Sequence, residues 1–190
     1  MNIFLIGYRG CGKTTVARHL AEQLGWPWLD ADTVLEERAG KSIKEIFAES
    51  GEQAFRDLES AVVADLAAFE RHVIALGGGA ILREKNRGAL AGRGTVAWLQ
   101  ASPETLAARI AADPATAERR PNLTGQGGLA EIRSLLDERT PLYRQCADLI
   151  VDAERPPAEL AREIARFVAG QHSQTITQPL PQPNPQRNSA

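Results

Sequence analysis

The segment Gly7 to Thr14, near the start of the chain, has the residue types and spacing of a phosphate-binding loop. It reads Gly-Tyr-Arg-Gly-Cys-Gly-Lys-Thr and follows an apolar stretch. Glycines let successive backbone N–H groups converge on phosphate oxygens, Lys13 supplies a cation, and the Thr14 hydroxyl can bind magnesium. This P-loop predicts nucleotide binding without naming a reaction, since motors, switches and small-molecule kinases all share it.

Two carboxylates, Asp30 and Asp32, follow a short stretch, 26–29, that predicts a strand. One carboxylate can hold a magnesium-bound water, while the other accepts a hydrogen bond, and then the proton, from a substrate hydroxyl. The alternative is that one aspartate only caps a helix beginning at Thr33, because acidic caps are common. Since the pair follows a P-loop, we expect it to take part in the chemistry.

Arg56 and Glu59 lie three residues apart in a segment that predicts a helix, and hence on one helix face. The glutamate could orient the guanidinium toward a substrate carboxylate. The alternative is a solvated surface pair, worth about 0.3–0.5 kcal/mol.

Three consecutive glycines, Gly77, Gly78 and Gly79, follow a predicted buried strand at 72–76. Consecutive glycines are costly to order, so their presence indicates that the backbone must approach a ligand closely. A plain tight turn is the competing interpretation.

Arginines occur in and after an aperiodic segment, 111–128, in which Asp, Pro, Asn and Gly also accumulate. The pattern predicts a mobile loop that carries Arg119 and Arg120, followed by a helix that carries Arg139. A loop arginine can fold over the nucleotide and neutralise charge that develops on a transferred phosphoryl group. The competing interpretation is a solvated basic loop.

Strand-like and helix-like segments alternate along the chain, which predicts an α/β fold of three layers with a mainly parallel sheet between helices. Ligands of such sheets bind outside the carboxyl ends of the strands, which is where these motifs lie. We expect five strands, at 2–6, 26–29, 72–76, 95–99 and 147–151. We expect the main helices at 13–24, at 43–47, after Gly51 through 69, from 103, over 131–143, and from 157 to about 170.

The composition is typical of one globular domain, with 190 residues, 43% hydrophobic residues and a formal net charge of −2. That charge provides no general attraction to nucleic acid. One of the two cysteines, Cys11, lies in the P-loop, so we expect no disulfide framework. Without a signal segment or a run of about 20 apolar residues, we expect a cytoplasmic protein that binds no membrane. Residues 171–190 are rich in Gln, Pro, Asn and Ser, which predicts a disordered tail after a domain of residues 1–170.

In their order and spacing, the motifs together resemble the shikimate kinase family. The resemblance covers about 2–168 and rests on the P-loop, Asp30-x-Asp32, Phe55-Arg56-x-x-Glu59, the three glycines, Arg120-Pro121 and Arg139-x-Pro141-Leu142-Tyr143. It implies a P-loop fold like that of nucleoside monophosphate kinases, with a substrate-binding helical segment at about 31–60 and a lid at about 111–128. It also implies transfer of the ATP γ-phosphate to the 3-hydroxyl of shikimate, in the synthesis of chorismate and aromatic amino acids.

The family pattern implies a role for each matching residue. Shikimate would be bound by Asp32, which would also act as the base, and by Arg56, Gly77, Gly78, Gly79 and Arg139. ATP would be bound by Gly10, Cys11, Gly12, Lys13, Thr14, Thr15, Arg120 and Arg155, with Lys13 and Arg120 acting in catalysis. Thr14 would bind Mg²⁺ directly and Asp30 through a water molecule. We expect the protein to act as a monomer.

The chain departs from the commonest family pattern in the lid. It reads Arg120-Pro121-Asn122-Leu123-Thr124-Gly125, where many members have two leucines after the proline, and the stretch 109–120 is long. Two other interpretations stay open. A kinase for another hydroxylated metabolite would keep the P-loop but lack these substrate arginines. A non-catalytic nucleotide-binding switch would need neither Asp32 nor the arginines.

Overall fold

The computed structural model describes residues 1–113 and 128–175. In that part of the chain, five parallel strands form one sheet in the order β2-β3-β1-β4-β5. The strands are β1 (Asn2–Ile6), β2 (Trp28–Asp30), β3 (Val73–Ala75), β4 (Gly94–Gln100) and β5 (Leu149–Asp152). The predicted fold class, with its five-stranded parallel sheet, is confirmed.

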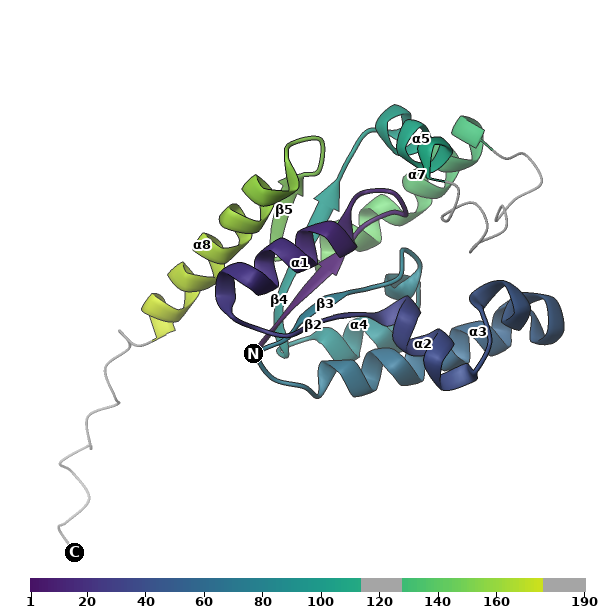
Figure 1. The fold of residues 1–190 in the computed structure, drawn as a ribbon, viewed down its shortest axis with the longest axis horizontal. Helices are drawn as coiled ribbons and strands as arrows, with labels where there is room; N and C mark the ends of the chain where they lie inside the picture. Colours follow the sequence, from purple (N-terminus) through teal and green to yellow (C-terminus); the bar gives the residue numbers. More distant parts are fainter. Residues whose placement is uncertain (114–127, 176–190) are drawn as a thin grey trace, which may run out of the picture.

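Helices cover both faces of the sheet, as Figure 1 shows. On one face, α1 (Lys13–Leu24) packs beside α8 (Pro157–Thr175), and on the other, α3 (Ile43–Ala67) packs beside α4 (Glu84–Leu90). The remaining helices are α2 (Ala31–Ala39), which packs on α3, and α5 (Pro103–Ala112), which packs on α7 (Gly128–Cys146). A short 3-10 helix, η1 (Ala80–Leu82), follows β3.

The central strand β1 is buried on both faces because successive side chains of a strand point to opposite sides. Ile3 and Leu5 pack in the same core cluster as residues of α1 and α8, whereas Phe4 and Ile6 pack with residues of α3. None of these four side chains is more than 1% exposed. The P-loop therefore follows a strand that is buried on both faces and lies between β3 and β4.

Most strands and helices differ by a few residues from the expected ranges, and four differences are larger or change an element. Helix α2 begins at Ala31, before the expected Thr33, because Asp30 ends β2 and caps the helix. The two helices expected between 43 and 69 form one element, α3, that is kinked at Gly51, where φ is 77° and ψ is 177°. The sequence pattern did not predict α4. Helix α8 continues to Thr175, so residues 171–175 are helical and are not part of a tail.

No helix in the described ranges, 1–113 and 128–175, has both the length and the apolar content that a membrane crossing requires. The expected tail beyond residue 175 and most of the expected lid lie outside those ranges.

Candidate active site

A cleft of about 510 Å³ opens at the carboxyl edge of the sheet, beside the P-loop. Its walls come from the start of α1, the β2–α2 junction, the glycine turn after β3, the end of α5 and the loop before α8. Ten of the predicted site residues line it: Gly10, Cys11, Gly12, Lys13, Thr14, Thr15, Asp30, Asp32, Gly78 and Arg155. Among the described residues, Arg56, Gly77, Gly79 and Arg139 are not part of this lining, and Arg120 lies outside the description.

The P-loop is wound around the ammonium group of Lys13. Nζ donates to the carbonyl oxygens of Gly7 and Tyr8, at 2.9 Å each, and lies 3.7 Å from the buried Sγ of Cys11. Gly7 has a φ of 138°, and a Cβ there would lie 2.5 Å from the Leu99 carbonyl oxygen. Only glycine fits at that position, so the loop is held in its turn against β4 by close backbone packing.

Asp30 links the P-loop to the start of α2. Its Oδ2 accepts a hydrogen bond from the Thr14 hydroxyl at 2.7 Å, and its Oδ1 accepts one from the Asp32 backbone N–H at 3.0 Å. The capping alternative is therefore true of Asp30, yet the same side chain also lines the cleft. Mg²⁺ prefers oxygen ligands and commonly takes one or two protein groups together with phosphate oxygens. The hydroxyl of Thr14 beside this carboxylate fits such an ion.

The buried Arg56 pairs with two carboxylates. Its Nη1 donates to Glu59 at 2.8 Å, and its Nε and Nη2 donate to Glu52 at 3.3 and 3.2 Å. Arg56 is 8% exposed and Glu59 is 3% exposed, so the alternative of a solvated surface pair is wrong. Glu59 holds the guanidinium in one orientation at the edge of α3.

The glycine turn lies between Arg56 and the P-loop. A Cβ on Gly79 would clash with the Arg56 guanidinium, and a Cβ on Gly78 would lie 3.3 Å from the backbone nitrogen of Arg9. The Gly77 carbonyl accepts a hydrogen bond from Ala80 at 3.0 Å, so these residues also form the tight turn of the competing interpretation. Glycine is needed in this turn because the Arg56 side chain and the P-loop backbone both lie within contact distance of the turn's backbone.

Helix α7 brings Arg139 toward the same region. Arg139 is 5% exposed, its guanidinium carbon lies 5.6 Å from the centre of the Tyr8 ring, and its Nε has no hydrogen-bond partner among the described residues. One turn later, the Tyr143 hydroxyl donates to the Gly78 carbonyl at 2.5 Å. Burial raises the pKa of this hydroxyl, so it stays protonated and remains a donor.

The rim near α8 is held by ion pairs and a helix cap. Arg155 pairs with Glu159 at 3.2 Å and with Glu163 at 2.6 Å, and all three side chains are exposed. The adjacent Glu154 accepts hydrogen bonds from Ser102, through both its backbone N–H and its hydroxyl, and from the Thr105 hydroxyl. This loop is thereby attached to the first turn of α5.

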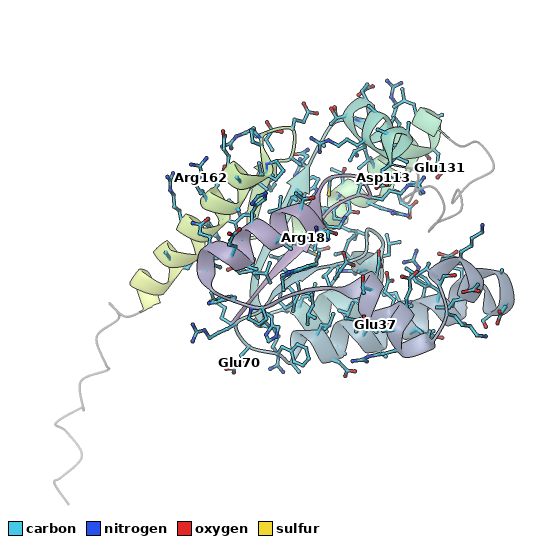
Figure 2. The ribbon with its side chains drawn as sticks, viewed as in Figure 1. Arg18, Glu37, Glu70, Asp113, Glu131 and Arg162 are labelled. Carbon is cyan, nitrogen blue, oxygen red and sulfur yellow. The ribbon has the colours of Figure 1, made fainter. Side chains whose placement is uncertain are left out.

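The sequence interpretation missed several residues of the site. Arg109 and Asp113 line the cleft from the last turn and end of α5, and Arg9 pairs at 3.3 Å with Glu131, which is 1% exposed and lies near the start of α7 (Figure 2). Glu52 was missed as well, although its spacing of four residues from Arg56 follows the rule that identified Glu59. The contact between Arg9 and Glu131 joins distant segments, and no local pattern indicates it.

Comparison with known proteins agrees with this geometry. A family model described as shikimate kinase matches residues 9–169. The chain belongs to the shikimate kinase family.

Individual shikimate kinases match over nearly the whole described chain. A shikimate kinase of Rhodopirellula baltica is 48% identical over 166 residues, which are 87% of this chain and 89% of that protein. One from Trichormus variabilis is 44% identical over 177 residues, covering 92% and 94%. The solved structure of the Acinetobacter baumannii shikimate kinase in complex with shikimate superposes with a TM-score of 0.83 at 37% identity, covering 90% of this chain and 93% of that one. The resemblance inferred from the motifs is confirmed.

Proposed function

We propose that the chain transfers the γ-phosphoryl group of ATP to the 3-hydroxyl of shikimate, forming shikimate 3-phosphate on the route to chorismate and aromatic amino acids. Family membership supports this activity. The observation that carries it is the single cleft in which Lys13 and Thr14 face the same space as Asp32 and Gly78. A phosphate donor and an alcohol acceptor could meet there.

The phosphate side of the site is the P-loop with Asp30. Gly10, Cys11, Gly12 and Thr15 would offer backbone N–H groups to phosphate oxygens, and Lys13 would add positive charge. The carbonyls of Gly7 and Tyr8 keep the Lys13 ammonium inside the loop, so its charge is already in place before the nucleotide binds. Arg155 would border the nucleotide at the rim, and Arg120 is proposed to neutralise charge on the transferred group.

Thr14 would hold Mg²⁺ through its hydroxyl and Asp30 through a water molecule. When bound, the ion neutralises negative charge on the phosphate oxygens. The hydrogen bond of 2.7 Å from the Thr14 hydroxyl to the Asp30 carboxylate keeps the oxygens of both side chains at the edge of the cleft.

The acid side of the site is the cluster of Arg56, Glu59, the glycine turn and Arg139. Arg56 and Arg139 would bind the carboxylate of shikimate, since a planar guanidinium matches a carboxylate with two parallel hydrogen bonds. Gly77, Gly78 and Gly79 would lie against the ring of the acid. Glu59 would act through Arg56, which it keeps in orientation.

Asp32 would accept the proton of the acceptor hydroxyl as the oxygen attacks phosphorus. The new oxygen–phosphorus bond forms, the bond from the γ-phosphorus to the bridging oxygen of ATP breaks, and the departing group is ADP. The protein forms no covalent intermediate in this scheme, so catalysis rests on positioning and on charge stabilisation.

One assay tests the activity: ADP release measured with shikimate, without it, and with a panel of other hydroxylated acids, sugars and nucleotides. We expect release that depends on shikimate. Release that follows another acceptor would instead indicate a different kinase, and binding of ATP without release under any condition would indicate a switch. We further propose that the protein acts as a cytoplasmic monomer without nucleic acid or membrane partners. Size-exclusion chromatography with light scattering tests whether the protein is a monomer.

A further inference from the structure

Arg56 is held at two different edges of its guanidinium by its two carboxylates. Glu59 accepts from Nη1, whereas a single oxygen of Glu52 accepts from both Nε and Nη2. Nε and Nη2 form the side-on edge, which can bind a carboxylate through two hydrogen bonds. The end-on edge, formed by Nη1 and Nη2, faces Gly79, where even an added Cβ would lie 2.9 Å from Nη2 and closer to Nη1. An incoming carboxylate therefore has room to pair with both N–H groups only at the edge that Glu52 occupies.

The charges on the acid side give a further anion no net attraction while Glu52 is in place. Arg56 and Arg139 with Glu52 and Glu59 give a formal charge of zero, and the acid side becomes positive only when Glu52 turns away. Glu59 is 3% exposed and enclosed, whereas Glu52 is 64% exposed. Glu52 is thus the carboxylate that can leave, because water can solvate it once it turns away.

The backbone next to Glu52 is the kink of α3. Glu52 directly follows Gly51, whose φ of 77° interrupts the helix, and a Cβ at Gly51 would meet nothing within 4 Å. Arg56, one turn further on, lies in the regular part of the helix and is 8% exposed. The exposed carboxylate of Glu52 therefore extends from the irregular part of α3 beside the kink, whereas Arg56, which it covers, is fixed in the regular part.

We propose that Glu52 sets the affinity of the acid side for its acceptor: in the free protein it occupies the side-on edge of Arg56, and the carboxylate of the acceptor displaces it. This inference rests on the proposed function. A neutral acceptor cannot replace the lost ion pair and leaves Glu52 in place, so Glu52 competes with the acid alone and lowers the affinity for it.

The test is steady-state kinetics of Glu52→Gln with shikimate and with its neutral methyl ester. Removing the competing charge is expected to lower the KM for shikimate about threefold to fivefold, as for an exposed ion pair, with kcat unchanged. The KM for the methyl ester is expected to change less than about twofold, since no charge competes with that ligand. The difference between the wild-type and Glu52→Gln KM values for shikimate is expected to shrink in high salt, because salt screens exposed charges.

Glu49→Gln is the matched control. Glu49 lies on the other side of the kink and pairs with Lys41, so this substitution removes the same charge at a residue that does not contact Arg56. Its KM is expected to equal that of the wild type. A raised or unchanged KM in Glu52→Gln overturns the proposal, as does an equal fall in both variants. If Glu52→Gln fails to fold, Glu52→Asp, whose shorter side chain draws back from Arg56, should lower the KM, and an unchanged value overturns the proposal. Wild-type protein that releases no ADP with shikimate would instead refute the proposed function.

Discussion

The phosphate side and the acid side of the candidate site are built in opposite ways. The phosphate side is made largely of backbone from one contiguous segment, where Gly7 packs on β4 and Lys13 is held by carbonyls of its own loop. The acid side is made of charged side chains from distant segments, with Arg56 on α3, Gly79 after β3 and Arg139 on α7. The phosphate side therefore depends on local conformation, and the acid side on long-range packing and on the balance of buried charge.

Substitution of Lys13 should have the largest effect, because the loop carbonyls hold this cation inside the turn, whereas the loop's other cation, Arg9, pairs with Glu131. Lys13→Ala is expected to lower kcat by about a thousandfold or more, as when a preorganised charge is removed from a transition state. The measurement is ADP release with shikimate. The exposed Lys44→Ala serves as a control with normal turnover, and thermal unfolding should show that both variants keep the wild-type fold. Near-normal turnover of Lys13→Ala would show that the phosphate side works without this charge.

Arg56→Ala should damage the acid side and leave the phosphate side intact. Loss of the guanidinium would remove the proposed charge-assisted contact to the acceptor and leave Glu59 buried without this cation, so shikimate binding should weaken by about 3 kcal/mol. Isothermal titration with shikimate, and separately with ATP, measures the two sides. An equal loss of affinity for both ligands would contradict the separation of the two sides.

Gly79→Ala tests whether backbone matters on the acid side as well. The added Cβ would clash with the Arg56 guanidinium and push it from its position, which should weaken shikimate binding by about 1–2 kcal/mol. Gly88→Ala is the control, since a Cβ there, in helix α4, meets nothing within 4 Å and should stabilise the fold by up to about 1 kcal/mol. If Gly79→Ala binds shikimate normally, the close approach of the turn has no role in placing Arg56.

The smallest effect concerns the rim of the phosphate side. Hydrogen bonds from Ser102 and Thr105 lower the pKa of Glu154 from its ordinary value of 4.5 to about 2. The stability that these bonds contribute is present above pH 4.5 and is lost as the pH falls toward 2, because the unfolded chain then binds the proton first. The Tm difference between the wild type and Glu154→Gln should therefore narrow between pH 5 and pH 3. A difference independent of pH would mean that ionised Glu154 does not hold the rim.

The contrast between the two sides also explains what could be predicted from the sequence. The P-loop and the Asp30–Asp32 pair are contiguous or nearly so, and each follows a strand, so their place at the sheet edge followed from topology alone. Arg56 and Glu59 could be paired through helical spacing. The role proposed for Arg139 came only from family resemblance, because no local pattern places this residue near Tyr8.

Other features of the site depend on contacts that no local pattern contains. The hydrogen bond from Tyr143 to Gly78 and the ion pair from Arg9 to Glu131 each join residues far apart in the chain. The extension of α8 past Gly170 was missed because a helical glycine followed by polar residues predicts a helix end. The packed apolar residues of α8 end at Val168, and beyond them the Gln171 side chain accepts a hydrogen bond from the Thr95 hydroxyl at 3.2 Å.

The central position of β1 has a consequence for synthesis of the protein. This strand leaves the ribosome before its neighbours, since Ile3 pairs with Val73 on one side and with Thr95 on the other, and both partners are translated much later. The P-loop that follows β1 packs against Leu99 of the later strand. A nascent chain can therefore assemble a nucleotide site only after residue 100 has emerged, and ATP binding becomes a marker of how far co-translational folding has advanced.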